Sequence, residues 1–588
     1  MRRNLLCHIL LAALPAFPQA VGSLKTIAVP KPSNLDRYVR DQNVLVVLGK
    51  ALFWDMQLGS DNRTACATCH FHAGADHRVQ NQLSNPKAAF PPNHELKLDE
   101  FPFRLFSDTG DNRSALLRDS GRRVGSAGVF RRIFSDVSAD GMSEDAVDAV
   151  DTTGFNMGTL NVRQVTPRNT PSVINAVFNM RNLWDGRASD IFTGATPFGD
   201  SDGRANAIAA RDGQIVREQV RIDNSSLASQ AVGPPMNDVE MSYQGRTWPK
   251  LGKRMLALRP LARQRVDPED SVLGPFANTE RPGLSDSYTY LTLVRLAFQP
   301  EYWQVPDVAE NFSLFFGLAV QAYQATLISD DSRLDRFFEG DGSALTAEEQ
   351  RGLRLFQSRG ECTDCHRGPE FTEASFTSIR IRGRVRRIRN GLLSDTGFFH
   401  TGVRPAFEDS GLDDKDDFGR PFSLAAAEDP GTRLGISGAF KTPGIRNVEF
   451  TGPYFHNGGQ ATLEQLVEFY NRGGDYPEAP NLSPDVRRLN LNSEERAALV
   501  AFMKALSDDR VRFERAPFDH PELCVPAGHD LQPAGERYPL SAADRWAAIP
   551  AVGRNGNQAP LQTFEELLQG IGNDGSRSHT LRDACVIP

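Results

Sequence analysis

The chain has 588 residues and a formal net charge of −8, with 24% of its residues charged and 40% hydrophobic. This length allows more than one domain with a substantial core. The acidic balance gives no basic footprint, so we expect no nucleic-acid partner. Beyond the N-terminal segment no apolar run approaches the length of a membrane span, so we expect no membrane-spanning helix.

Residues 1–22 have the pattern of a secretory signal peptide. Arg2 and Arg3 precede an apolar run over residues 5–17, and the small residues that follow predict cleavage after Gly22. We therefore expect a soluble, exported protein, located in a bacterial periplasm.

A Cys-x-x-Cys-His motif follows the first predicted helix. Apolar residues recur at helical spacing over 44–51, and this helix leads into Cys66, Cys69 and His70. Two thiols three residues apart, followed at once by an imidazole, are typical of covalent haem c. The thiols bond the haem vinyl groups and the histidine binds the iron. A second strong helix is predicted over 312–323.

The same motif recurs once, at Cys362, Cys365 and His366. A structural zinc site needs four ligands, and no further cysteine lies near either motif. A redox Cys-x-x-Cys pair needs no histidine directly after it. The sequence therefore predicts two covalently bound haem c groups.

The cysteines outside the motifs predict a disulfide. Cys7 leaves with the signal peptide, and four of the remaining six cysteines belong to the two motifs. Cys524 and Cys585 are left in an oxidising compartment, where pairing is the default.

Residues 72–160 break the helical pattern with frequent Pro, Asn, Asp and Gly. We predict a long insertion of loops with one helix near Glu144–Val150. His72, His77 and His94 lie in it and are interpreted as surface histidines or as supporting residues around the first motif.

The second half begins after a linker predicted at Glu339–Gly342. Thr346 and Glu349 form a capping box that opens the helix before the second motif. Asn492 and Glu495 form another that opens a closing helix.

A basic run follows the second motif. A solvated strand or loop is the favoured interpretation, and docking of an acidic partner or neutralisation of haem propionates are the alternatives. The run consists of Arg380, Arg382, Arg384, Arg386, Arg387 and Arg389.

The two halves share one plan of amphipathic helix, haem motif, irregular segment and closing helix. We predict a mainly α fold with two cytochrome c-like haem domains and long loop insertions. The predicted domains are residues 23–338 and 339–510, and residues 511–588 form a C-terminal extension tied down by Cys524–Cys585.

Ordered motifs carry a family resemblance. Leu-Trp-Asp-Gly-Arg at 183–187 and Pro-Tyr-Phe-His-Asn-Gly at 453–458, in order with the two haem motifs, resemble the bacterial di-haem cytochrome c peroxidase family, which includes MauG. The resemblance covers roughly residues 40–70 and 160–510, with insertions.

The resemblance implies a peroxide-binding pocket at the first haem. Gln230, Pro234 and Glu240 occupy the family's distal positions with the spacing preserved. O–O cleavage needs a proton moved from one peroxide oxygen to the other, which a carboxylate in a partly dry pocket can do. Gln230 would hydrogen-bond the peroxide, and Pro234 would shape the space.

Two axial positions depart from the ordinary family members. Asn161 stands where those members have a histidine that closes the first haem, so the resemblance implies an open or water-bound iron, unless Met157 or a loop histidine binds it. Tyr470 stands where they have a methionine at the second haem, as in MauG. A phenolate ligand lowers the potential of the iron, whereas methionine raises it.

The resemblance also implies two functions between the haems. Trp184 would relay oxidising equivalents, although a buried core tryptophan is the alternative. Asn169, Thr451 and Pro453 match an interdomain Ca²⁺ site, where amide and carbonyl oxygens suit a hard cation.

We therefore expect a di-haem peroxidase that reduces H₂O₂ and shares oxidising equivalents between two haems. Its electron donor would be a small cytochrome or cupredoxin. A monomer and a homodimer are both alternatives for its oligomeric state. The enzyme alternatives are a MauG-like oxidase of a partner protein and a rubber-oxygenase-like haem dioxygenase. The non-enzymatic alternative is an electron-transfer di-haem cytochrome.

Overall fold

The fold is that of a computed structural model. It describes residues 20–588 apart from 81, 85–93, 158–159, 205, 389–390, 430–432, 535–537, 573–575, 578–584 and 586–588. Most of the predicted signal peptide, and Arg389 of the basic run, lie outside the described residues. No helix in the part that is described has both the length and the apolar character that crossing a bilayer requires.

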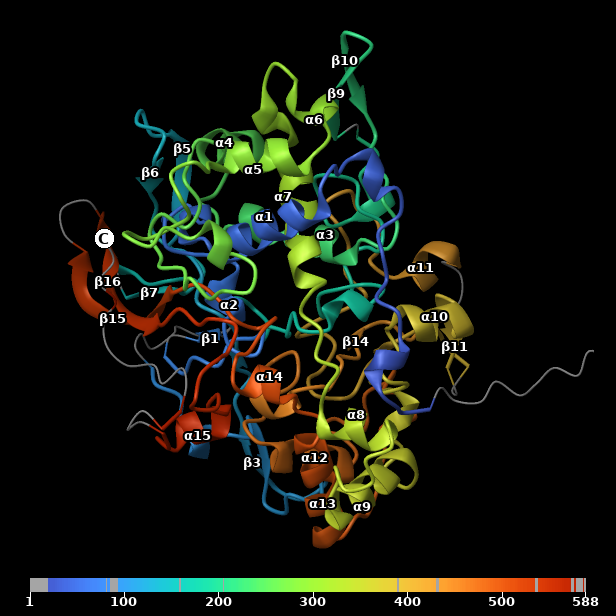
Figure 1. The fold of residues 1–588 in the computed structure, drawn as a ribbon. Helices are drawn as coiled ribbons and strands as arrows, with labels where there is room; N and C mark the ends of the chain where they lie inside the picture. Colours follow the sequence, from blue (N-terminus) through green and yellow to red (C-terminus); the bar gives the residue numbers. More distant parts are fainter. Residues whose placement is uncertain are drawn as a thin grey trace, which may run out of the picture.

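The helices around the first haem motif form the upper part of the molecule in Figure 1. Helix α1 (Gln42–Trp54) packs against α7 (Phe312–Gln324) and α5 (Tyr290–Ala297), which confirms the two helices predicted here. Asp41 caps α1 by accepting from two backbone N–H groups of its first turn. Short helix α2 (Ala67–His70) then carries the motif.

The helices around the second motif repeat this arrangement in the lower part of Figure 1. Helix α9 (Ala347–Gln357) packs against α13 (Ser493–Lys504), and α12 (Leu463–Asn471) packs against α13. Both predicted capping boxes, Thr346 with Glu349 and Asn492 with Glu495, are confirmed.

One glycine brings each helix pair into close contact. A Cβ built on Gly49 of α1 would stand 1.9 Å from the Ala319 carbonyl oxygen of α7. A Cβ on Gly352 of α9 would stand 2.0 Å from the Ala498 carbonyl oxygen of α13. Only glycine permits these approaches, so both halves use one packing solution next to their haem motifs.

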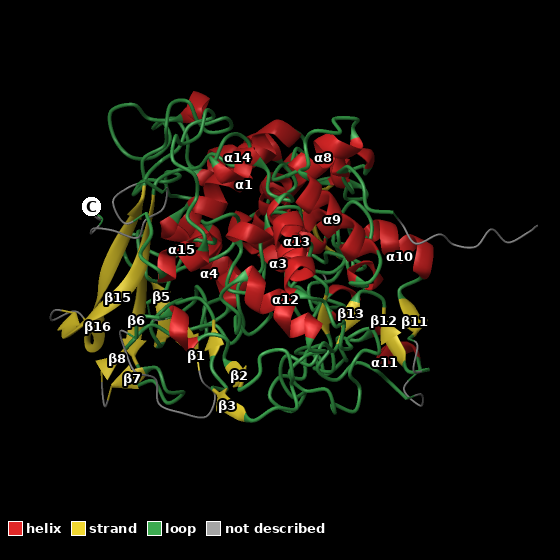
Figure 2. Ribbon diagram, turned by 90° about the horizontal axis from the view of Figure 1, so that it is seen from below, coloured by secondary structure: helices red, strands yellow, loops and turns green. Residues whose placement is uncertain are grey.

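The prediction of a mainly α fold is wrong. The structure is 28% helical and 18% strand. Strands lie along one side of the molecule and around its rim, while helices fill the centre (Figure 2). The segment predicted as a helix near Glu144–Val150 is strand β6 (Glu144–Asp148), paired antiparallel with β5 (Arg132–Val137).

Most of the described strands form two-stranded antiparallel sheets. The other antiparallel pairs are β1 (Leu83–Ser84) with β4 (Arg123–Val124), β2 (Arg104–Phe106) with β3 (Leu116–Asp119), β9 (Ala207–Arg211) with β10 (Gln214–Glu218), β11 (Val385–Arg387) with β12 (Leu393–Asp395), and β13 (Phe398–Phe399) with β14 (Phe440–Lys441). The remaining helices are α3 (Ser226–Ala231), α4 (Trp248–Met255), α6 (Pro300–Trp303), α8 (Arg333–Phe338), α10 (Phe376–Arg382), α11 (Leu424–Glu428), α14 (Asp509–Arg512) and α15 (Phe564–Leu568).

The C-terminal extension is built into the first half of the molecule. Its long strands β15 (Leu523–Ala534) and β16 (Tyr538–Ile549) join β8 (Leu160–Asn161) and β7 (Asn156–Met157) in a four-stranded sheet of order β15-β16-β8-β7. Cys524 and Cys585 form a disulfide, with Cα atoms 5.9 Å apart.

Buried ion pairs tie this extension to the core. Arg163 pairs with Asp544 of β16 and with Asp61, both within 2.9 Å. Lys50 of α1 lies 3.6 Å from Asp519. The largest apolar core accordingly combines helices α1, α5 and α7 with residues of the extension, and a second core lies under α9, α12 and α13.

Candidate haem-binding site

The first motif histidine is held by the backbone. Nδ1 of His70 lies 2.8 Å from the Gly74 carbonyl oxygen, so a neutral ring donates its Nδ1–H there and leaves Nε2 free. Burial lowers the pKa of His70, which favours this neutral form. A ring whose second nitrogen is fixed in this way is oriented for metal ligation.

The second motif histidine has the same arrangement. Nδ1 of His366 lies 3.0 Å from the Phe371 carbonyl oxygen, and burial lowers the pKa of His366. An aromatic ring of the preceding helix also lies beside each histidine. The ring centroids of Phe53 and His70 are 6.2 Å apart, and those of Phe356 and His366 are 6.4 Å apart.

The motif thiols suit covalent attachment better than thiolate coordination. Burial raises the pKa of Cys66, Cys69 and Cys362 to about 12. Zinc needs thiolates and further ligands. No cluster of three or more His, Cys, Asp or Glu suited to a metal ion occurs among the described residues.

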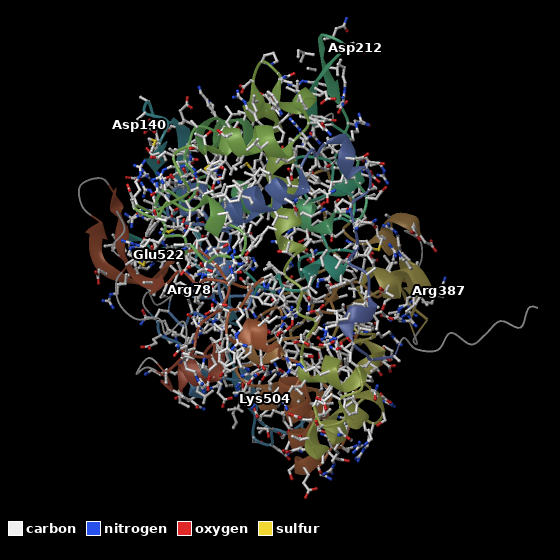
Figure 3. All side chains as sticks on the ribbon, viewed as in Figure 1. Arg78, Asp140, Asp212, Arg387, Lys504 and Glu522 are labelled. Atoms are coloured by element: carbon white, nitrogen blue, oxygen red, sulfur yellow. A yellow bond between two sulfur atoms is a disulfide. The ribbon has the colours of Figure 1, made fainter. Side chains whose placement is uncertain are left out.

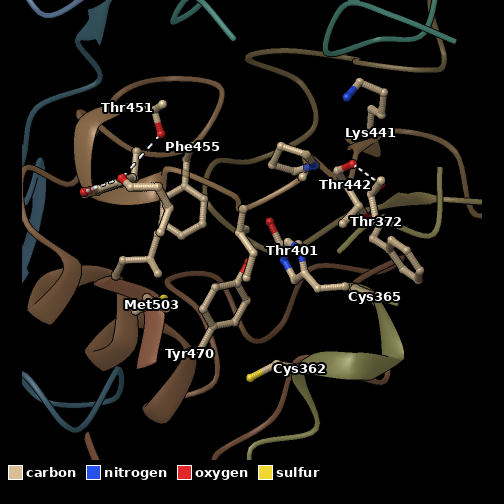
Figure 4. Close-up of a pocket in the computed structure, with 18 of the residues that line it drawn as sticks. Cys362, Cys365, Thr372, Thr401, Lys441, Thr442, Thr451, Phe455, Tyr470 and Met503 are labelled. Carbon is tan, nitrogen blue, oxygen red and sulfur yellow. Dashed lines mark hydrogen bonds between the residues drawn. The ribbon is translucent and has the colours of Figure 1, made fainter. Parts of the chain in front are cut away.

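A large cavity lies at the second motif (Figure 4), with an empty volume of about 2,050 Å³ including the space at its mouth. Cys362, Cys365 and His366 line one part of it, and Tyr470 of α12 points into it. Most of its other lining is apolar, so the donor set and walls fit a covalently bound haem c.

Tyr470 shares this cavity with a second candidate ligand. Burial raises the pKa of Tyr470, and the nearby Cys365 and Cys362 would raise it further if ionised. Met503 of α13 also lines the cavity. In the sequence this thioether is part of the apolar face of the closing helix, so the pattern does not mark it as a ligand.

The space at His70 is partly built by the C-terminal extension. A smaller cavity, of about 400 Å³ including the space at its mouth, is lined by His70, Trp54, Tyr323, Phe518 and His520. The Trp54 indole stacks on His520 with centroids 4.6 Å apart, and its N–H donates to the Tyr323 hydroxyl at 2.9 Å. No sequence pattern predicts that residues 511–561 reach the first haem site, because the contact joins segments that are far apart in the chain.

The three predicted distal residues follow one another along helix α3, a short turn and a loop. Gln230 is buried in α3, and its side-chain oxygen has no hydrogen-bond partner among the described residues. Pro234 opens the next turn. Glu240 is close enough to Cys66 and Cys69 that its charge would raise the pKa of both thiols. Burial raises the pKa of Glu240 itself, and Arg187 opposes this.

Trp184 lies beside the second cavity and is fixed there by hydrogen bonds. Its indole N–H donates to the Asn169 carbonyl oxygen at 2.7 Å, and its own carbonyl accepts from the Lys441 N–H at 2.8 Å. Its ring centroid is 6.3 Å from that of His456. This location is compatible with a relay between two haems and also with a structural role.

The predicted Ca²⁺ ligands are neighbours. The Asn169 side-chain amide contacts the Pro453 carbonyl oxygen and lies 3.4 Å from that of Phe455. Thr451 lines the same cavity, and its hydroxyl donates to the Val448 carbonyl oxygen at 3.4 Å. The set contains oxygen ligands but no carboxylate.

Two of the residues considered as closing ligands of the first haem, Asn161 and His94, form other side-chain contacts. Asn161 is buried, with its side chain accepting from the Asp151 N–H at 2.8 Å and donating to the Ala149 carbonyl oxygen at 2.6 Å. Met157 is 39% exposed, and His94 lies 2.9 Å from the Glu100 carboxylate. His72 and His77 are not on the surface: they are buried, with rings stacked 3.6 Å apart.

The basic run is only partly a solvated segment. Arg382 and Arg386, with Arg367, surround the buried carboxylate of Glu373, while Arg387 reaches the surface (Figure 3).

The chain is similar to known di-haem peroxidases. The family model for di-haem cytochrome c peroxidase matches residues 43–114 and 139–343. Cytochrome-c peroxidase IdrP1 of Denitromonas iodatirespirans is 34% identical over 226 residues, which are 36% of this chain and 56% of that protein. Methylamine utilization protein MauG of Methylorubrum extorquens is 30% identical over 192 residues, 32% of this chain and 42% of that protein.

A further relative covers more of the chain. Cytochrome c551 peroxidase of Nitrosomonas europaea is 25% identical over 360 residues, 60% of this chain and 69% of that protein. The chain spans 55–61% of the length of the first three curated relatives it matches.

Two Cys-x-x-Cys-His motifs with oriented histidines define a di-haem c-type cytochrome. Over residues 43–114 and 139–343 the chain matches the model of the di-haem cytochrome c peroxidase family, which confirms the predicted resemblance. The family implies two haem c groups and a peroxidase-like oxidoreductase.

Proposed function

We propose that this chain is a periplasmic di-haem peroxidase that reduces H₂O₂ to water. The observation that carries the proposal is the repeated geometry of His70 and His366, each with Nδ1 held by a backbone carbonyl beside two neutral thiols. Cys66 and Cys69 would hold one haem, and Cys362 and Cys365 the other. When bound, these groups supply the peroxide-reactive iron and a store for electrons.

The residues near the first haem would manage protons. H₂O₂ takes up two electrons and two protons to give two water molecules. The Glu240 carboxylate would accept a proton from one peroxide oxygen and return it to the oxygen that leaves. The side-chain oxygen of Gln230, buried and without a partner among the residues that the structure describes, would accept a hydrogen bond from the peroxide. Pro234 would limit the space.

Electrons would reach this site through the second half of the molecule. Trp184 lies at the edge of the second cavity and would carry oxidising equivalents between the haems. The donor would be a small cytochrome or cupredoxin. Asn169, Thr451 and Pro453 would hold Ca²⁺ next to this path, and chelation would then impair transfer without releasing haem.

A second candidate is a MauG-like oxidase of a partner protein. The position of Tyr470 in the second cavity favours it, because a phenolate ligand lowers the potential and makes the iron a poor electron store. Under that function the two oxidised haems would take electrons from side chains of the partner protein instead of from a cytochrome.

Steady-state assays on the full-length holoprotein test the proposal. Haem content should be two per chain by absorbance and intact mass. Turnover of H₂O₂ with a reduced small cytochrome should exceed any O₂ consumption with an isoprenoid. Two haems without H₂O₂ turnover, but with oxidation of a partner, would favour the second candidate.

A further inference from the structure

The two buried lysines of the described residues differ in their surroundings. Lys50 is fully buried, and its ammonium lies 2.8 Å from Asp270 and 3.6 Å from Asp519. Lys441 is 5% exposed, and no described side chain or carbonyl group pairs with its ammonium. An unpaired ammonium is unfavourable in a protein interior, so such a group marks a site where an anion is missing.

The backbone of Lys441 is fixed, so the side chain cannot leave this environment by moving the strand. Lys441 ends β14, pairs with Phe398 of β13, and donates its N–H to the Trp184 carbonyl oxygen at 2.8 Å. Burial is the sole cause that lowers its pKa, to about 8, because no acid lies close enough to oppose it. The amine therefore stays mostly protonated at neutral pH.

Lys441 belongs to the wall of the second cavity. Lys441 and its neighbour Thr442 line the space that also contains Cys362, Cys365 and His366 (Figure 4). A haem attached to those cysteines brings carboxylates of its own, because each haem carries two propionates. The missing anion and the unpaired cation thus meet in one cavity.

We propose that the Lys441 ammonium binds a propionate carboxylate of the second haem. This inference rests on the proposed haem attachment at Cys362 and Cys365. Lys441 is then a positioning residue that orients the haem plane and places a buried positive charge beside it. A positive charge favours the reduced iron, so Lys441 opposes the effect of the Tyr470 phenolate on the potential.

Two neutral variants test the assignment. In Lys441→Met and Lys441→Gln holoprotein, spectroelectrochemical titration should show a lower potential for the second haem, equivalent to about a tenfold smaller reduced-to-oxidised ratio at fixed potential. The propionate bending bands of the resonance Raman spectrum should shift. Lys441→Arg should keep the potential close to that of the wild type.

The exposed Lys504 of α13, labelled in Figure 3, supplies a matched control. Lys504→Met removes the same charge outside the cavity and should leave both potentials unchanged, because solvent and salt screen it. If the first haem potential moves instead of the second, the carboxylate belongs to the first haem and the assignment is overturned. Unchanged potentials and unchanged propionate bands in the neutral variants also overturn it.

Haem counting separates this inference from the proposed function. A wild-type chain without covalent haem at Cys362 and Cys365 contradicts the proposed function. Two haems per chain with no response to the loss of the Lys441 charge contradict only the inference. If Lys441→Met does not fold, Lys441→Gln also removes the charge and allows the same measurement of the second-haem potential, because the amide changes the polarity of the site less.

Discussion

The Nδ1 atom of His70 lies 2.8 Å from the carbonyl oxygen of Gly74, and this one contact determines which ring nitrogen is available to a metal. Gly74 has φ = +74°, a conformation that favours glycine. A Cβ at this position would stand 2.8 Å from the Ser172 hydroxyl and 3.0 Å from the Val173 nitrogen. The backbone that orients the histidine is therefore closely packed as well as left-handed.

Gly74→Ala should weaken the orientation of His70. The added methyl displaces the 74 carbonyl, so the histidine loses part of its hydrogen bond and becomes a weaker donor to iron. We expect a lower iron–histidine stretching frequency in the ferrous protein, a raised potential of the first haem, and a loss of about 1–3 kcal/mol in the free energy of unfolding.

Gly213→Ala is the matched control. Gly213 has φ = +77° in the β9–β10 turn, and a Cβ there would meet nothing within 4 Å. It shares the backbone strain and lacks the contact with the site. An equal change of the iron–histidine band in both variants would show that strain alone, and not the Gly74 carbonyl, is responsible.

Glu240→Gln should slow peroxide cleavage by about 10²–10⁴ while both haems stay attached. The amide keeps the shape of the side chain but cannot accept the proton. Stopped-flow absorbance after mixing with H₂O₂ measures the step. Glu494→Gln, at an exposed position of α13, serves as the charge control.

The pH dependence gives an independent test of Glu240. Burial raises the pKa of this carboxyl, so it becomes protonated at a higher pH than an ordinary glutamate. Because the carboxylate form accepts the proton, the rate should fall as the pH decreases through that raised pKa. This fall of the rate at low pH should be missing in Glu240→Gln. If the variant still shows it, the titrating group is a residue other than Glu240.

The first haem should be five-coordinate or water-bound as isolated. Hydrogen bonds to the backbone at 149 and 151 hold the Asn161 side chain, and Met157 is at the surface. Electron paramagnetic resonance of the ferric protein should show a high-spin signal from one haem. A spectrum with two low-spin haems, and no reaction with peroxide before reduction, would rule out this expectation.

Local features of the fold could be predicted from the sequence. The haem motifs, both capping boxes and the helices beside them depend on residues a few positions apart, and the structure has them as expected. The insertion was predicted incorrectly as loop with one helix. Its hairpin β5–β6 pairs the exposed apolar residues Ile133 and Val147 across two strands, so neither residue marks a core face.

Long-range contacts account for what the sequence could not show. Residues 511–561 enter the first haem site through ion pairs such as Lys50 with Asp519, whose partners are far apart in the chain. Lys441 lies at a cavity whose wall is formed by several segments that are far apart in the chain. A lysine in a Lys-Thr-Pro sequence gives no local sign of this environment.

The second haem carries the most specific prediction, because two candidate ligands line its cavity. Tyr470 projects from α12, and Met503 lies on α13. If the Tyr470 phenolate binds the iron, that haem has a low potential and is hard to reduce with cytochrome donors. Tyr470→Met should raise its potential, and Met503→Leu should leave it unchanged.

Tyr454 is the matched control for the loss of a buried phenol. It lines the same cavity and donates its hydroxyl to the Val448 carbonyl oxygen at 3.1 Å. Tyr454→Phe should therefore keep the spectrum of the second haem, whereas Tyr470→Phe should open an axial position on it.

The most direct test is a redox titration, followed by absorbance, of the wild type and Tyr470→Met. The account predicts a low second-haem potential in the wild type, a clearly higher one in Tyr470→Met, and different ligand-field bands. Equal potentials and equal bands in the two proteins would show that Tyr470 is a core aromatic residue and that its phenolate is not a ligand.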